Sequence, residues 1–406
     1  WLKPFAMQPK LTWKSFKGSW KLHDRDGRYE VEHRDDACWH IALGDGRSAL
    51  LTATSVKVLA GREIHLPDVP CHEGSLQIEV ISSEIIKEIQ NRSNQGAFFL
   101  LPSQLNGAEY PSHRSAVKNV ESYLWDHTGG PRGQLACHPG VAQCILDNAT
   151  KAVDVDENFG GDRGLTAVDW LLEETGANAG AKGRFSHAFC VENGYLRIPG
   201  GLEPAERAAA LAAFGSSWTR LRILCAEDVP ATGLGVTLSE WSTARHKVSL
   251  VYGSAVPVDA YNNCALTDED LDFQRSVSKV VLVGQYLGAM LKAAARLKKT
   301  GTQLLYMMPL GGGVFNNRTE DIADAVGIAL SLLPRAVGLE NASRVRFRFL
   351  CFELTAENVA FEAEFRRLGI LAGGSRRGKA RRIPEREGDD PDVRRPTKAA
   401  RHTYSI

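Results

Sequence analysis

An apolar stretch that runs into three glycines, LLYMMPLGGGVFNN at residues 304–317, constrains the fold more than any other part of the sequence. Residues 304–309 are apolar without alternation, which is typical of a strand covered on both faces. Such strands lie inside the sheets of α/β proteins, and ligands bind beyond their carboxyl ends. The sequence therefore predicts a buried strand that leads into a binding loop.

The glycines of this loop favour close contact with an anion. Gly311, Gly312 and Gly313 lack a Cβ atom, so the backbone can adopt positive φ angles and its N–H groups can approach a bulky anion. The loop matches neither the P-loop pattern nor GxGxxG. A tight turn between strand and helix is the alternative interpretation, and it would account for one or two of the glycines.

A helix is expected directly after the glycines. Asn317 has the position of an N-cap, with Glu320 as its reciprocal partner. The free N–H groups and the dipole at the start of such a helix favour a phosphate group. One apolar face of the expected helix is formed by Ile322, Val326, Ala329 and Leu333.

Strand and helix signals alternate along the chain from about residue 82. This alternation predicts an α/β domain with a largely parallel or mixed sheet. Helices are expected at 82–92, 166–176, 204–215, 267–299 and 318–333, and strands at 96–102, 220–226, 246–256, 304–309 and 344–353.

The composition is that of an ordinary globular protein. The chain has 406 residues, with 43% hydrophobic and 24% charged residues, and its formal net charge of +1 gives no bias toward nucleic acid or acidic lipid. The longest apolar run, 280–291, is too short to span a bilayer and is expected to be a buried helix, so no membrane contact is predicted.

The eight cysteines are scattered, without a CxxC pair or a His/Cys cluster at zinc spacing. We therefore expect reduced thiols, a cytoplasmic or nuclear location, no metal and no cofactor. The chain begins at Trp1 without a signal-peptide pattern, so a fragment and a missing targeting segment both stay open.

Three parts of different character follow one another. Residues 1–94 are expected to form an N-terminal β-containing extension, and 95–355 the main domain, with an insertion at about 150–245. From Ser375 to His402 there are ten Lys/Arg against five Asp/Glu and almost nothing apolar, which predicts a disordered basic tail over 372–406. Weak contact of this tail with polyanions is conceivable, and a solvated tail without a partner is the favoured interpretation.

Small and polar residues also follow two other expected strands. Residues 101–112 (LPSQLNGAEYPS) and 253–263 (GSAVPVDAYNN) each continue a strand end, and 126–149 (DHTGGPRGQLACHPGVAQCILDNA) places glycines before a helix that starts at Pro139. Loops at one edge of a sheet converge. They could therefore enclose one elongated ligand that carries phosphate groups.

The order of these segments over residues 95–355 resembles a macrodomain, and its details look closer to the divergent MavL-type macro-like ADP-ribosyl hydrolases. The resemblance implies a three-layer fold in which two glycine loops grip the diphosphate of ADP-ribose. SQLNGAEY stands where the family has NAAN, residues 150–245 interrupt the compact domain, and the glutamate pair of poly(ADP-ribose) glycohydrolases is missing.

The resemblance also implies roles for individual residues. Gly311 to Val314 would supply N–H donors, with Asn316 beside them, and Phe315 would cover the distal ribose or be a plain core residue. Gly129, Gly130 and Gly133 would form the facing wall, and Gln134 would bind a phosphate or cap its helix. Asn106 is equated with the family asparagine, and Asn262 and Asn263 would contact ribose hydroxyls or only form a turn.

Cleavage of a glycosidic bond passes through an oxocarbenium-like state and needs a carboxylate. We favour Asp259, which follows a buried strand directly; its alternative is a turn aspartate that bonds its own backbone. Glu109 and Asp126 rank lower because either could pair with Arg114 or Arg132.

The polar groups at three strand ends favour an ADP-ribosyl hydrolase that acts on ADP-ribosylated protein. Recognition of a diphosphate alone would need fewer such groups. A reader that binds ADP-ribose without cleaving it, and a macro-like scaffold that acts through its N-terminal region and tail, are the alternatives.

Overall fold

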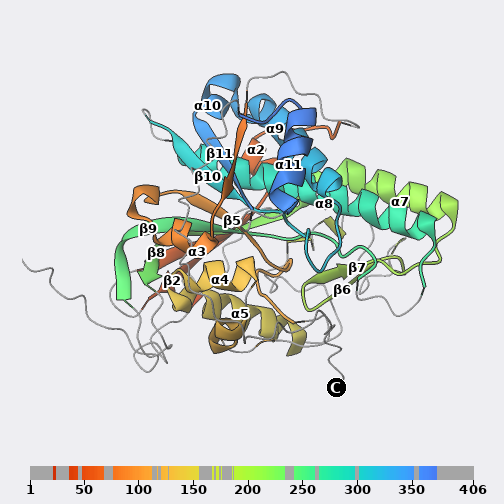
Figure 1. The fold of residues 1–406 in the computed structure, drawn as a ribbon. Helices are drawn as coiled ribbons and strands as arrows, with labels where there is room; N and C mark the ends of the chain where they lie inside the picture. The colour runs from red at the N-terminus through yellow and green to blue at the C-terminus, as the bar shows by residue number, and fades with distance from the viewer. Residues whose placement is uncertain are drawn as a thin grey trace, which may run out of the picture. The chain divides into compact units, whose positions relative to one another are not determined.

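The computed structural model describes residues 22–23, 36–43, 48–67, 76–111, 117, 120–126, 128–154, 167–168, 171–172, 175, 185, 187–233, 242–260, 265–297, 301–351 and 356–372 (Figure 1). All of these residues belong to one compact unit that ends at Ala372. The predicted disordered tail, apart from its first residue, lies outside the described residues, as do Asn262 and Asn263.

A nine-stranded mixed sheet forms the centre of this unit, in the order β1-β2-β3-β8-β9-β5-β10-β11-β4. Strands β9, β5, β10, β11 and β4 run parallel, and the pairs from β1 to β9 are antiparallel. The strands span Leu22–His23 (β1), Asp36–Ala42 (β2), Ser48–Ser55 (β3), Ile78–Ser82 (β4), Phe98–Pro102 (β5), Arg222–Gly233 (β8), Ser242–Gly253 (β9), Gln303–Met307 (β10) and Val345–Cys351 (β11).

Strand β10 lies inside the sheet, between β5 and β11, as its apolar sequence predicts. Leu305 and Met307 belong to the core on one face of the sheet, and Tyr306 and Met308 to the core on the other face. The absence of alternation in the sequence thus has its expected cause, because both faces of β10 are covered.

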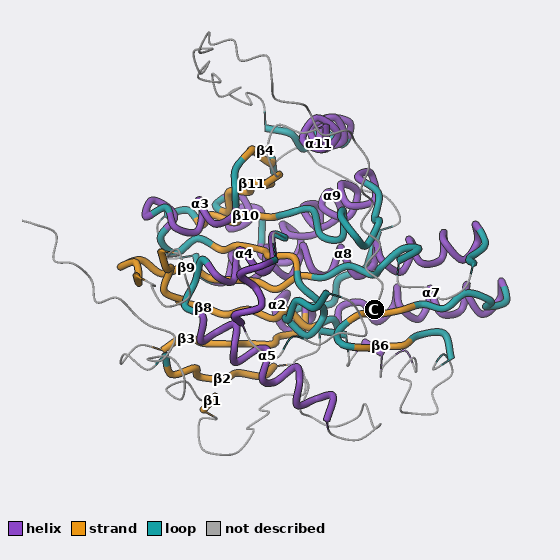
Figure 2. The backbone as a smooth tube through the Cα atoms, turned by 60° about the horizontal axis from the view of Figure 1, so that its bottom comes forward, coloured by secondary structure: helices purple, strands orange, loops and turns teal. Residues whose placement is uncertain are grey.

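Helices cover both faces of the sheet (Figures 1 and 2). One layer contains α2 (Val56–Ala60), α7 (Pro204–Ser217), α8 (Asp268–Ala295), α9 (Thr319–Val337) and α11 (Ala356–Arg367). The other contains α3 (Ile85–Gln90), α4 (Gly129–Leu135) and α5 (Pro139–Asp154). The predicted three-layer α/β fold with a mixed sheet is confirmed.

The helix signals of the sequence hold well at α8. Thr267 and Asp270 form a reciprocal capping box at the start of the helix predicted from residue 267, and α8 then runs for 28 residues. Two details of α9 differ from the prediction: its N-cap position is Arg318, and Pro334 lies within its last turn instead of ending it. Only three residues of α9 follow Pro334, so the helix ends one turn beyond its predicted end.

The described strands of residues 1–94 belong to the same sheet as the main domain. Strand β3 pairs with β8 near one edge, and β4 pairs with β11 at the other. These strands therefore do not form a separate unit. Their partners lie more than a hundred residues away, and such pairing leaves little trace in local sequence.

Two small elements complete the architecture. The hairpin of β6 (Cys190–Glu192) and β7 (Tyr195–Arg197) comes from the predicted insertion, and α10 (Leu339–Ser343) precedes β11. No helix among the described residues is long and apolar enough to cross a membrane.

Candidate functional site

The glycine loop leaves β10 through a sharp turn. Gly311 has a φ of 72°, and a Cβ atom there would lie 2.5 Å from the Ala255 Cβ. Asn316 also has a positive φ, at 56°. Gly311 thus allows the turn and the close approach of the loop after β9, which confirms its predicted backbone role.

Several peptide N–H groups of this loop donate no hydrogen bond to the residues that the structure describes. Within the loop, the N–H of Gly312 donates to the Pro309 carbonyl (3.4 Å) and that of Asn316 to the Gly313 carbonyl (3.0 Å). The N–H groups of Gly311, Gly313 and Val314 donate to no group of the described residues. Val314 is 69% exposed. The loop therefore presents backbone donors that an anion can accept.

The side chain of Asn317 bonds the glycine loop and does not cap α9. The predicted capping box of Asn317 with Glu320 is therefore wrong. Asn317 Nδ2 donates to the Val256 carbonyl (3.0 Å) and the Gly311 carbonyl (3.3 Å), and its Oδ1 accepts from the Ser278 hydroxyl (2.6 Å). The side chain is 6% exposed. A carboxamide can satisfy several buried loop groups at once, which a capping position would not allow.

We expect Asn317→Ala to lower the free energy of unfolding by about 2 kcal/mol, because it leaves buried polar partners of Asn317 unsatisfied. Urea denaturation measures the change. Asn341→Ala is the matched control, since Asn341 is exposed and its side chain bonds only the Val337 carbonyl among the described residues. It should shift stability by less than about 0.5 kcal/mol. Equal effects of the two changes would contradict the bracing role of Asn317.

Phe315 connects the glycine loop to two other segments. Its ring lies 5.5 Å from the Tyr195 ring of the β6–β7 hairpin, and its carbonyl accepts from the Val258 N–H (2.8 Å). The side chain is partly buried against the cores on both faces of the sheet. Phe315 thus packs against the core on both faces and is half-buried.

The loop after β9 runs alongside the glycine loop. Asp259 is exposed, has a φ of 55°, and its N–H donates to Gln274 Oε1 (3.0 Å). The positive φ is typical of a turn aspartate, the alternative that the sequence left open, while the N–H bond reaches Gln274 of α8 and not the backbone of the turn itself. Asp259 therefore stays a prediction as a catalytic acid.

The turn after β5 is built around Asn106. The Gln104 N–H donates to the Ala108 carbonyl, and the Ala108 N–H donates to Asn106 Oδ1 (3.1 Å). Asn106 is 4% exposed, and the hairpin turn at Gly194 lies directly on it, since a Cβ atom there would be 2.6 Å from the Asn106 side chain. The buried side chain of Asn106 thus stabilises this turn.

The glycines of 129–133 belong to α4 itself, not to a loop before a helix. A Cβ atom at Gly129 would lie 2.7 Å from Met308 Cε, one at Gly130 2.1 Å from the Pro102 carbonyl, and one at Gly133 2.6 Å from Leu101 Cδ2. These glycines let α4 pack closely against the carboxyl ends of β5 and β10. These glycines therefore place α4, which is predicted to face the glycine loop, next to β10, the strand that leads into that loop.

Gln134 does not cap its helix, and its role toward a phosphate stays a prediction. It is 1% exposed, and its Nε2 donates to the Gly107 carbonyl (3.3 Å). It therefore joins α4 to the turn after β5.

Glu109 is the most perturbed acid of the predicted set. Its carboxylate faces α4, because a Cβ atom at Gly130 would lie 2.3 Å from Glu109 Oε1. Burial, and then the charge of Asp126, raise the pKa of Glu109 well above its usual value. Asp126 Oδ1 accepts from the Thr128 N–H (2.8 Å) and hydroxyl (2.6 Å). The structure thus brings two of the three predicted acids together, and one of them favours its protonated form.

The raised pKa of Glu109 predicts a pH-dependent penalty on stability. Below pH 4.5, the usual value of the group, both folded and unfolded states hold the proton. Above it, only the unfolded state releases the proton freely, so stability falls by up to about 1.4 kcal/mol per pH unit until the folded pKa is reached. We expect Glu109→Gln to gain on wild type as pH rises from 4 to 8 in thermal unfolding. A constant difference would contradict the raised pKa.

Sequence reasoning missed the residues that lie behind and beside the loops. Tyr195 bonds the turn after β5: its hydroxyl accepts from Gln104 Nε2 (2.8 Å) and donates to the Tyr110 carbonyl (2.7 Å). The dipeptide Asn193–Gly194, both with positive φ, is a hairpin signal that could have located this tyrosine. The buried polar residues of α8, Gln274, Ser278 and Tyr286, have no comparable signal in the local sequence.

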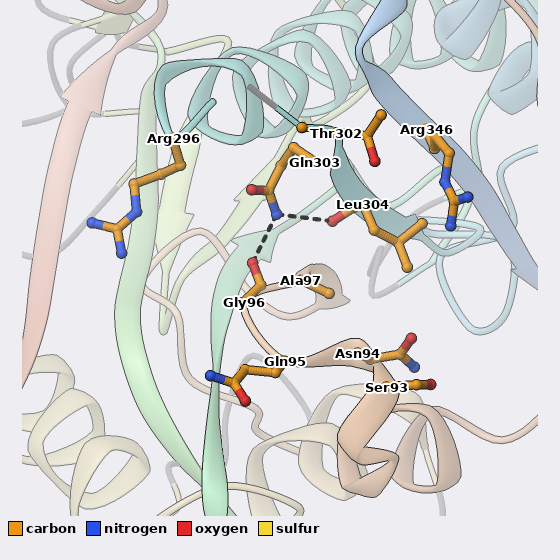
Figure 3. Close-up of a pocket in the computed structure, with 11 residues that line it drawn as sticks. Ser93, Asn94, Gln95, Gly96, Ala97, Arg296, Thr302, Gln303, Leu304 and Arg346 are labelled. Carbon is orange, nitrogen blue, oxygen red and sulfur yellow. Dashed lines mark hydrogen bonds between the residues drawn. The ribbon is translucent and has the colours of Figure 1, made fainter. Parts of the chain in front are cut away.

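A hollow of about 330 Å³ lies at the opposite, amino ends of β5 and β10 (Figure 3). It is bounded by residues 93–97 and 301–304, and Gln303 Nε2 donates across it to the Gly96 carbonyl (2.7 Å). Arg296 in its wall is already paired with Glu227 and Asp228. This hollow is therefore separate from the loops at the carboxyl ends. No cluster of metal-ligating side chains occurs in the part of the chain that the structure describes.

No protein-family model and no curated protein matches this sequence. Among solved structures, poly(ADP-ribose) glycohydrolase from Thermomonospora curvata bound to the inhibitor ADP-HPD has a TM-score of 0.40 and 13% identity, covering 87% of this chain and 96% of that chain. The enzyme from Deinococcus radiodurans in complex with ADP-ribose has a TM-score of 0.38 and 11% identity, covering 77% and 90%. At these values, the roles of individual residues have to come from the geometry of this chain.

Proposed function

We propose that this protein is an ADP-ribosyl hydrolase, which releases ADP-ribose from modified protein side chains at the carboxyl ends of β5, β9 and β10. The observation that carries the proposal is the set of N–H groups at Gly311, Gly313 and Val314 that donate to no group of the described residues. They lie on an exposed loop that is braced from behind by Asn317.

A diphosphate is the ligand chemistry that fits these donors. Several convergent N–H groups without side chains in the way can bind phosphate oxygens, and the start of α9 adds a favourable dipole. Phe315 follows these donors directly, and its half-buried ring could contact a sugar. ADP-ribose combines a diphosphate with a ribose on each side, so it can occupy both features.

Glu109 is our choice as the proton donor. Hydrolysis of a glycosidic bond needs a carboxylic acid that is protonated near neutral pH to protonate the leaving group. The raised pKa of Glu109 suits this role, and the neighbouring charge of Asp126 supports it. Asp259, exposed and with its backbone N–H bound to Gln274, ranks second on this geometry.

A reader that binds ADP-ribose without cleaving it is the second candidate. It is favoured by the fact that the donors of the glycine loop need no acid to hold a diphosphate. A macro-like scaffold that acts through the N-terminal region and the tail is the remaining alternative. Residues 1–21 and 373–406 of these parts lie outside the described residues.

The deciding experiment has two measurements on the wild-type protein. The first is release of ADP-ribose from proteins modified on Arg, Asp/Glu or Ser. The second is capture of the same modified proteins by the wild-type protein immobilised on beads. Release in any series supports the hydrolase. Capture without release establishes the reader. Neither capture nor release by folded protein overturns the proposed function.

A further inference from the structure

Helix α8 carries three buried polar side chains under the candidate site. Gln274, Ser278 and Tyr286 are each 1% exposed or less. The helix contacts β5, β9 and β10, whose carboxyl ends carry the loops of the candidate site. Buried polar groups cost stability unless they are bonded, so the partners of these three show what they hold.

Tyr286 bonds both sides of the exit from β10. Its hydroxyl donates to the Met308 carbonyl (2.8 Å) and accepts from the Leu310 N–H (3.0 Å). The N–H of Leu310, just before Gly311, is therefore used in a buried hydrogen bond. The chain then turns at Gly311, and the following unused N–H groups lie on the exposed part of the loop.

Ser278 holds the other end of the same loop. Its hydroxyl donates to Asn317 Oδ1 (2.6 Å) and accepts from the Val256 N–H (3.2 Å). Gln274 extends the pattern, since its Oε1 accepts from the Asp259 N–H and its Nε2 donates to the Ile198 carbonyl (2.7 Å). One helix thus fixes the entry and the exit of the glycine loop, together with the loop after β9.

We propose that Tyr286 is a positioning residue for phosphate binding, which aligns the N–H groups of Gly311, Gly313 and Val314 by holding Met308 and Leu310. This inference rests on the proposed function for the identity of the ligand. Its physical basis is independent of the ligand: a hydrogen bond in a dry interior is strong, and it fixes the plane of the peptide that precedes the turn. Preorganised donors bind an anion without the cost of ordering the loop.

Tyr286→Phe tests the proposal, with Tyr306→Phe as its matched control. Both tyrosines are fully buried, and both hydroxyls make two hydrogen bonds, but that of Tyr306 bonds the side chains of Glu88 and Arg348. Hydrogen exchange at residues 308–316 and calorimetry with ADP-ribose are measured for wild type and both variants.

We expect Tyr286→Phe to speed amide exchange at residues 310–315 and to weaken ADP-ribose binding about tenfold. Tyr306→Phe should leave both quantities at wild-type values, even where its melting temperature falls equally. Equal losses of binding in the two variants would overturn the positioning role and leave a merely structural one. Unchanged exchange in Tyr286→Phe would also overturn it.

The exchange measurement separates this inference from the proposed function. If wild type does not bind ADP-ribose, the proposed function fails. Faster exchange confined to the loop of Tyr286→Phe still supports positioning by Tyr286 in that case. If wild type binds and exchange is unchanged, the positioning role fails and the proposed function stands.

Discussion

Gly312→Glu is expected to abolish ADP-ribose binding while the protein stays folded. Gly312 is exposed, and its φ is not in the positive range, so a glutamate fits the backbone without strain. Its carboxylate would stand among the N–H groups that we assign to the diphosphate. Like charges placed together cost several kcal/mol, which corresponds to a loss of more than about 100-fold in affinity.

Gly215→Glu is the matched control for this change. Gly215 has open space around its position on α7, and the substitution adds the same charge outside the glycine loop. Calorimetry should show wild-type affinity for this variant, and circular dichroism should show that both variants are folded. Binding by Gly312→Glu at wild-type strength would remove the glycine loop from the site.

Glu109→Gln is expected to reduce the release of ADP-ribose by about 10²- to 10⁴-fold, while ADP-ribose binding stays close to that of wild type. Glutamine keeps the size of the side chain but cannot donate a proton to a leaving group. The buried environment and raised pKa of Glu109 make it the acid that the geometry favours.

Asp259→Asn is the comparison that decides between the two acids. We expect it to retain most activity, because Asp259 is exposed and its conformation is that of a turn residue. The reverse result, full activity in Glu109→Gln and loss in Asp259→Asn, would restore the order of preference that the sequence alone suggested.

Local sequence patterns predicted the centre of the fold well. The apolar run of β10 indicates that both faces of the strand are buried, and the capping box of Thr267 and Asp270 marks the start of α8. Both signals depend on neighbours in the chain. The pairing of β3 with β8 and of β4 with β11 depends on partners far away, so the sequence predicts an N-terminal β-containing extension without placing its strands in the main sheet.

The candidate site was predictable in its backbone and less so in its side chains. A run of glycines after a strand indicates a bare loop whatever surrounds it. The role of Asn317 depends on Ser278 and Val256, which only the packing of α8 brings near. The ranking of Glu109 changed for the same reason, since its pKa depends on burial and on Asp126.

The central claim is that the loops at the carboxyl ends of β5, β9 and β10 bind ADP-ribose. Isothermal titration calorimetry of the wild-type protein with free ADP-ribose tests it most directly. We predict a single saturable binding event, accompanied by a rise in melting temperature. A folded protein that gives neither heat nor a thermal shift at millimolar ADP-ribose would contradict the claim.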